Sequence, residues 1–193
     1  MRLPDLAPED LDPEQRALYD AIVGGPRGTG TQHFPLTTRG GALTGPFGVM
    51  VHGPALGRPL QELGSALRYA TGLSDRLREI AILTVAGATR SEFERYAHER
   101  VGRAAGLSDD ELAALADGSF TSLSHAEQTA YDFCRRLLDG RPRLGNEEYA
   151  DLVAVLGTTT ITELTVLVGY YRTLSDLMAV YDVGAPEEQQ PGQ

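Results

Sequence analysis

The feature that most constrains the fold of this chain is the spacing of its apolar residues. From Arg58 onward, apolar side chains recur at steps of three and four residues, which is the period of an amphipathic α-helix. Strand-like alternation is missing, and the β-branched run 158–161 is too short to indicate a strand. The sequence therefore predicts an all-α chain, folded as a compact helical bundle in a single domain.

Glycine, proline and serine mark the ends of the expected helices. Pro13 suits the first turn of a short helix, Ser74, Ser91, Ser108 and Ser124 suit N-caps, and glycines suit the ends. Residues 24–48 are rich in glycine, threonine and proline without a helical period, which predicts a long loop. The expected helices cover residues 13–23, 59–71, 74–89, 91–106, 108–116, 124–140, 146–156 and 160–181.

The last expected helix is apolar on nearly all sides. Such a helix is either central to a bundle or buried between subunits. We therefore expect the chain to form a homo-oligomer. No run approaches 18 uninterrupted apolar residues, and the N-terminus lacks the apolar stretch of a secretion signal, so we expect no membrane span and a cytoplasmic location.

Charge and composition exclude several classes of function. The formal net charge is −10 and basic residues form no block, which argues against a nucleic-acid partner. All 17 basic residues are arginine, so no lysine can form a Schiff base or complete a phosphate-binding P-loop. The single cysteine, Cys134, excludes a Cys-x-x-Cys pair and a cysteine-rich zinc site within one chain.

One helical stripe could carry proton-transfer chemistry. Glu94 and His98 are four residues apart and share a helix face, with Ser91 one turn earlier on the same stripe. A carboxylate beside an imidazole at the edge of a core can accept and return a proton near neutral pH. Glu79 stands at the head of an apolar run on the preceding helix, where a charge is costly unless it has a partner.

A purely structural interpretation fits the same residues. Ser91 and Glu94 have the spacing of a helix capping box, and this spacing recurs at Ser108/Glu111 and Ser124/Glu127, where no chemistry is expected. His98 alone is typical of a core or surface histidine, and Glu79 could pair with Arg76 or Arg78 on its own helix. Periodicity does not decide between the two interpretations.

A family resemblance favours the chemical interpretation. Residues 73–83 resemble the Leu-Ser-x-Arg-x-Arg-Glu-x-x-Ile-Leu block of the carboxymuconolactone decarboxylase / alkylhydroperoxidase D superfamily, and residues 92–107 resemble its second block, with a Glu-x-x-x-His core. The peroxidase branch carries Glu-x11-Cys-x-x-Cys-x3-His, where this chain has Glu79, Ser91, Glu94 and His98 in register. Gly45–Gly48 and Glu163–Tyr171 also resemble longer members, so the resemblance spans about residues 45–182.

The resemblance implies an AhpD-like helical fold, commonly assembled as a trimer or hexamer. It divides the chain into an N-terminal arm, short helix and Gly-rich loop (1–44), the helical domain (45–182) and a disordered tail (183–193). Because Ser91 and Glu94 replace both cysteines, neither can attack or resolve a peroxide. Cys134 suits a small buried apolar residue, so thiol peroxidase activity is not expected.

We therefore expect an acid–base enzyme, a carboxymuconolactone decarboxylase-like lyase that acts on a small lactone, keto-acid or cyclic metabolite. His98 would donate the proton to the substrate. Glu94 would orient His98 or return a proton to it, and Glu79 would complete the proton network. No cofactor is expected. The alternatives are a non-thiol oxidative or metal-assisted enzyme using the same site and a non-catalytic ligand-binding relative. Arg76, Arg90 and Arg95 are candidates to bind a substrate carboxylate.

Two further residues are weaker candidates for substrate contact. His52 follows the Gly-Pro-Phe-Gly segment and would reach the site if the Gly-rich loop, which also contains His33, folds over it. Tyr96 lies between Glu94 and His98 in the sequence. A metal held by Glu79, Glu94 and His98 is conceivable from the ligand types, but a Glu/His pair four apart is unspecific.

Overall fold

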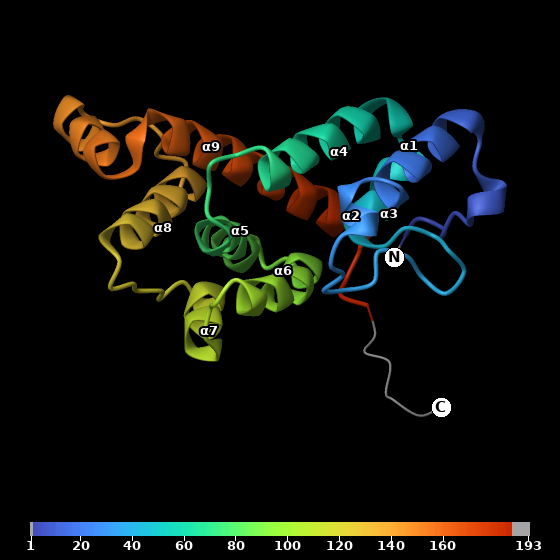
Figure 1. Cartoon of the computed structure of the whole chain (residues 1–193), viewed down its shortest axis with the longest axis horizontal. Coiled ribbons are helices and arrows are strands. Elements are labelled where there is room, and N and C mark those ends of the chain that lie inside the picture. The colour runs from blue at the N-terminus through green and yellow to red at the C-terminus, as the bar shows by residue number, and fades with distance from the viewer. Residues whose placement is uncertain (1, 187–193) are drawn as a thin grey trace.

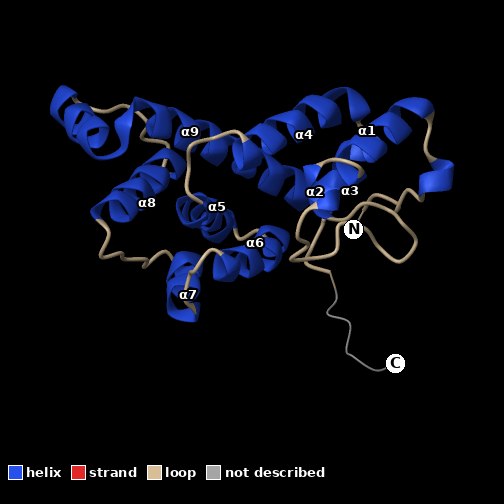
Figure 2. Cartoon of the chain, viewed as in Figure 1, coloured by secondary structure: helices blue, strands red, loops and turns tan. Residues whose placement is uncertain are grey.

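The computed structural model describes residues 2–186, and every regular element in this range is helical (Figure 2). The all-α fold predicted from apolar spacing is therefore confirmed. The N-terminal segment forms the 3-10 turn η1 (Pro8–Asp10), α1 (Pro13–Val23) and α2 (Pro26–Thr29). The remaining helices are α3 (Gly45–His52), α4 (Pro54–Tyr69), α5 (Asp75–Thr89), α6 (Glu92–Ala104), α7 (Asp109–Asp117), α8 (His125–Leu138) and α9 (Asn146–Tyr181).

Helix α5 lies at the centre of the fold, with α6, α7, α8 and α9 packed around it (Figure 1). Every residue from Arg78 to Ala86 is buried, as expected for a helix surrounded on all sides. Ile82 and Val85 belong to the main core, whereas Ile80 and Leu83 belong to a second core shared with α7 and α8. This central position carries Glu79 into the interior of the protein.

The serines expected to begin helices do so. The side chains of Ser74, Ser91, Ser108 and Ser124 each accept a hydrogen bond from a backbone N–H in the first turn of the helix that follows. Helix α4 begins at Pro54, earlier than the expected Pro59, because proline lacks the N–H that would have no partner at the first helical position. The 24–48 segment, expected to be a loop throughout, contains α2 and the start of α3.

The two helices expected at the C-terminal end are joined into α9. Gly157 interrupts it with φ 75° and ψ 157°, a conformation open essentially to glycine alone, which kinks the element at the predicted break. Helix α9 is long and apolar enough to cross a membrane by length and composition, with an 18-residue window of mean hydropathy 1.7, of which 22% is buried. The core helix of a soluble protein can satisfy the same criterion of length and apolar composition.

The N-terminal segment packs against the bundle. Leu18 and Ile22 of α1 are fully buried in the main core, and α1 contacts α3 and α4 (Figure 1). The proposed division at residues 44 and 182 remains a prediction. Residues 187–193 of the expected tail lie outside the described part of the chain.

Candidate active site

Helices α5 and α6 bring two residues of the predicted trio into direct contact. The imidazole Nδ1 of His98 lies 2.6 Å from Oε2 of Glu79, although the residues are 19 positions apart in sequence. Glu79 is 1% exposed and His98 is 6% exposed. With Glu79 accepting from Nδ1–H, the second nitrogen, Nε2, is left available for proton transfer.

Glu94 completes the trio from the other side of the ring. Its Oε2 lies 3.4 Å from Nε2 of His98, one turn away on α6, and the residue is 3% exposed. Its second oxygen, Oε1, is buried without a hydrogen-bond partner among the described residues. Glu79, His98 and Glu94 thus form a continuous carboxylate–imidazole–carboxylate array, which we call the proton-transfer array.

The capping interpretation of Glu94 applies to its backbone only. The N–H of Glu94 donates to Oγ of Ser91 at 3.5 Å, but the N–H of Ser91 donates to the carbonyl of Ala86. The Glu94 carboxylate therefore does not reach back to the N-cap. At the next helix, by contrast, the N–H of Ser108 donates to Glu111 at 2.8 Å and a full capping box forms.

A small cavity adjoins the proton-transfer array. Its volume is about 30 Å³, enough for about one water molecule. Glu94 and His98 line one side, and aromatic and apolar side chains make up most of the rest. The other lining residues are Arg27, Phe34, Pro46, Phe47, Arg68, Phe93, Ala97, Tyr170, Tyr171 and Leu174.

The surroundings tune the acidity of the cavity-lining groups. Burial raises the pKa of Glu94 to about 7, with a further upward contribution from Glu79, while His98 and Arg27 act in the opposite direction. Burial also raises the pKa of Tyr170 to about 12 and that of Tyr171 well above its ordinary value. At neutral pH Glu94 can therefore hold or release a proton, and both tyrosines remain neutral.

Several cavity residues were not expected from sequence. Tyr171 packs edge-on against His98 with ring centroids 5.2 Å apart, and Tyr170 packs edge-on against Tyr171. A Cβ at Gly64 of α4 would meet the Tyr170 hydroxyl at 2.1 Å, so glycine makes room for this tyrosine. The pair Tyr170–Tyr171 falls within a segment that carries the family resemblance, which is the one signal that could have identified it.

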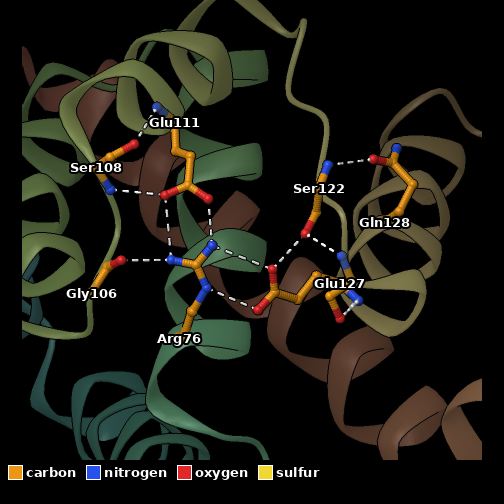
Figure 3. A network of polar contacts seen from close by, with 8 residues as sticks. Arg76, Gly106, Ser108, Glu111, Ser122, Glu127 and Gln128 are labelled. Atoms are coloured by element: carbon orange, nitrogen blue, oxygen red, sulfur yellow. Dashed lines mark hydrogen bonds and ion pairs between the residues drawn. The ribbon is translucent and has the colours of Figure 1, made fainter.

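The arginines proposed to bind a substrate carboxylate do not line this cavity, so that expectation is corrected. Arg76 is engaged by Glu111, Glu127 and the carbonyl of Gly106 (Figure 3). Arg90 is exposed at the C-terminal end of α5, where its backbone adopts the left-handed conformation of a C-cap. Arg95 is exposed and pairs with a carboxylate one turn later on α6. The cavity arginines are instead Arg27 and Arg68.

His52 and Tyr96 also lie outside the cavity lining. Nε2 of His52 is 3.0 Å from the carbonyl oxygen of Pro4, and the residue borders a different cavity between α3 and α4. Tyr96 stacks beneath the guanidinium of Arg100, 3.9 Å from its ring centroid. His52 thus contacts the N-terminal segment, and Tyr96 contacts a residue one turn later on its own helix.

Two other expectations concern metal and thiol chemistry. Within residues 2–186 no group of three or more His, Cys, Asp or Glu side chains is arranged to hold a metal ion, and both ring nitrogens of His98 face carboxylates. Cys134 is fully buried in the main core, where burial raises the pKa of its thiol to about 12. Such a thiol is not a nucleophile at neutral pH.

Several solved structures share the fold of this chain. The chain superimposes on an alkylhydroperoxidase AhpD core, an uncharacterized peroxidase-related protein from Ralstonia eutropha JMP134, with a TM-score of 0.74, 13% identity and 97% and 93% coverage of the two chains. A peroxidase-related protein from Silicibacter sp. TM1040 gives a TM-score of 0.74, 12% identity and coverages of 97% and 92%. A single-residue variant of the debrominase Bmp8, in complex with 2,3,4-tribromopyrrole, gives a TM-score of 0.71, 13% identity and coverages of 97% and 92%. The fold is therefore AhpD-like.

The central helices also match a known family in sequence. Residues 54–135 match the model of the carboxymuconolactone decarboxylase family, a range that includes Glu79, Glu94 and His98. This match and the AhpD-like fold agree with the resemblance seen in the sequence motifs. The curated protein sequences contain no significant match.

Proposed function

We propose that this protein is an acid–base enzyme that protonates or deprotonates carbon in a small cyclic metabolite, with decarboxylation as its principal reaction type. The observation that carries the proposal is the buried proton-transfer array beside a cavity. Both carboxylates are nearly inaccessible to water, and each faces a different nitrogen of one imidazole. Burying two carboxylates around one histidine costs free energy, and such buried titratable clusters are typical of sites that transfer protons.

Each member of the array has a distinct role in this proposal. In decarboxylation the carbon–carbon bond to the carboxylate breaks, CO₂ leaves, and the electron pair stays on the substrate as a delocalised carbanion. His98 donates a proton from Nε2 to that carbon, and Glu94 returns a proton to His98. Glu79 positions the imidazole through Nδ1.

The composition of the cavity supports a ring-shaped substrate. Aromatic side chains of Phe34, Phe47, Phe93, Tyr170 and Tyr171 surround the carboxylate and imidazole, and flat apolar walls favour planar rings. A protein of the same fold, the debrominase Bmp8, has been solved as a variant in complex with the small aromatic ring of 2,3,4-tribromopyrrole. The cysteine-free site of the present chain calls for chemistry without a thiol.

The test is turnover of small cyclic β-keto acids, lactone acids and enolisable ring ketones in D₂O, followed by NMR. We expect loss of CO₂ or deuterium incorporation at carbon with at least one substrate class. The variants His98→Gln and Glu94→Gln should lower the rate by roughly 10²–10⁴-fold, the usual contribution of general acid–base catalysis. Glu79→Gln should lower kcat while leaving KM near the wild-type value.

Glu99→Gln is the matched control, because Glu99 lies on the same helix and pairs with Arg95 outside the cavity. It should keep wild-type turnover, and a chelator should leave wild-type turnover unchanged. Full turnover by His98→Gln and Glu94→Gln would contradict the proposal and favour a non-catalytic ligand-binding protein. Loss of turnover on chelation would favour the metal-assisted alternative.

The pH profile gives an independent check. Donation requires that the proton be present on the array, and the pKa of Glu94 is raised to about 7. We therefore expect the decarboxylation rate to fall as pH rises through about 7. A rate that instead increases through this range would show that the ionised form of Glu94 is the active one and that the assigned direction of proton transfer is wrong.

A further inference from the structure

Two arginines at the cavity lack the partners that arginines usually have. Within residues 2–186, the guanidinium groups of Arg27 and Arg68 form no ion pair or hydrogen bond, and Nε of Arg27 is buried without a partner. Each instead lies near an aromatic ring, Arg27 at 5.1 Å from the centroid of Phe47 and Arg68 at 5.9 Å from that of Tyr69. A buried donor without an acceptor is costly, and an anionic ligand would satisfy it.

The same arginines line two small cavities. The first, here called the inner cavity, is lined by Glu94 and His98, and the second has a volume of about 40 Å³. Arg27, Arg68, Phe34 and Phe47 line both. The two cavities therefore adjoin at these four side chains.

The inner cavity is too small for a ring as it stands. Ligand pockets usually measure about 300–1,000 Å³, well above its volume of about 30 Å³. Two of the four residues that line both cavities, Arg27 and Phe34, belong to the Gly-rich segment, in which no residue from 24 to 41 is fully buried. Displacing a segment without buried residues costs little compared with opening the helical core.

We propose that Arg27 and Arg68 bind a carboxylate of the substrate while the 24–41 segment opens and closes over the ring. This inference rests on the proposed function, to which it adds the residues that hold the substrate. The planar guanidinium fork matches a carboxylate in a bidentate arrangement. A singly charged anion also suits a site that already holds two carboxylates, whereas a dianionic phosphate would add a further repulsive charge.

The test compares benzoate with its neutral isostere benzamide, with binding measured by calorimetry on the full chain. Wild type should bind benzoate about tenfold or more tightly than benzamide, and inorganic phosphate should not displace benzoate. Arg27→Gln should abolish the preference, and Arg68→Gln should reduce it. Arg27→Lys should restore part of it, since lysine keeps the charge but not the fork.

Arg95→Gln is the matched control, because it removes the same charge from an exposed position outside the cavity. It should keep the wild-type preference. Equal binding of benzoate and benzamide by wild type, or an unchanged preference in Arg27→Gln, would overturn the inference. Displacement of benzoate by phosphate would also overturn it, because the site would then recognise anions in general.

Glu94→Gln separates this inference from the proposed function. It should abolish proton transfer to carbon, yet bind benzoate at least as tightly as wild type, because one negative charge is removed from the cavity. A wild-type protein that prefers the anion but shows no carbon-acid turnover would leave the anion site standing and refute the proposed enzymatic function. Turnover of neutral cyclic substrates by a wild-type protein without anion preference would support the enzymatic function and refute the anion site.

Discussion

At the scale of single residues, two glutamates of the same type occupy unlike environments around one histidine. Glu79 lies 2.6 Å from Nδ1 of His98 and does not line the cavity, whereas Glu94 lies 3.4 Å from Nε2 and does line it. The first suits a residue that orients the imidazole, and the second suits one that exchanges protons with a ligand. Both carboxylates are buried, so their positions relative to the cavity are the cause of the difference in expected role.

The raised pKa of Glu94 should be visible in protein stability. A carboxyl whose folded-state pKa is raised from 4.5 to about 7 stabilises the fold fully below 4.5, and this contribution is lost as pH rises through 7. At about 1.4 kcal/mol per pKa unit, the loss is on the order of 3 kcal/mol. We expect Glu94→Gln, which cannot ionise, to gain stability relative to wild type by that amount between about pH 5 and about pH 8.

Urea unfolding of both proteins at the two pH values measures this difference. Glu99→Gln, on the same helix but outside the cavity, should track wild type at both. A difference between Glu94→Gln and wild type that does not change with pH would show that Glu94 titrates like an exposed glutamate.

At the scale of elements, Arg76 joins four parts of the chain. From the first turn of α5 it contacts Glu111 of α7, Glu127 of α8 and the carbonyl of Gly106 between α6 and α7 (Figure 3). Ser122 adds a hydrogen bond to Glu127 at 2.7 Å. This network holds α7 and α8 against the central helix and commits the Arg76 guanidinium to a structural role.

Replacing Arg76 by methionine should destabilise the protein by about 1.5–3 kcal/mol, since two partly buried carboxylates lose their charged hydrogen-bond donor. Hydrogen bonding to Arg76 lowers the pKa of Glu111 from 4.5, so the stabilisation is present above pH 4.5 and lost as the pH falls below it. The difference between wild type and Arg76→Met should therefore shrink in acid.

Thermal or urea unfolding measures the effect. Arg103→Met is the control, because Arg103 also pairs with α7, through Asp109, but in an exposed pair worth about 0–1 kcal/mol. Equal losses in the two variants would mean that Arg76 contributes no more than a surface ion pair.

At the scale of the whole molecule, α9 leaves much apolar surface uncovered. Only 22% of its most apolar window is buried, and Val166 and Val180 are 40% and 60% exposed. A surface of this kind favours contact with another copy of the chain. We propose that the chain forms a trimer or hexamer through α9, in line with the family resemblance.

Val166→Asp should therefore lower the molar mass measured by light scattering, because a charge would be buried between copies. Leu123→Asp is the control, since Leu123 is fully exposed in the α7–α8 connection, far along the chain from α9. A monomeric wild type would contradict the proposed assembly, and co-flotation of wild type with lipid vesicles would indicate that α9 meets a membrane.

Local spacing was sufficient to predict most of the helices and the shared helix face of Glu94 and His98. Glu94 and His98 are one turn apart on any helix, and the serine caps and the break at Gly157 depend on neighbours in sequence. Whether the Glu94 carboxylate caps its helix or faces His98 could not be predicted, because both arrangements use the same backbone. The packing of α6 against α5 decides it, by placing Glu79 at Nδ1.

The arginines at the cavity depended on tertiary structure alone. Arg27 lies in a segment without helical period, 67 residues before Glu94 by their numbers, and no local rule places it beside that carboxylate. From sequence alone Arg76 was a candidate to bind substrate and Arg27 was not. The packing of α7 and α8 reverses this, because it pairs Arg76 with Glu111 and Glu127. Sequence thus determined the helices and which residues share a helix face, because those depend on short-range geometry. The fold decided which charges meet, because that depends on long-range packing.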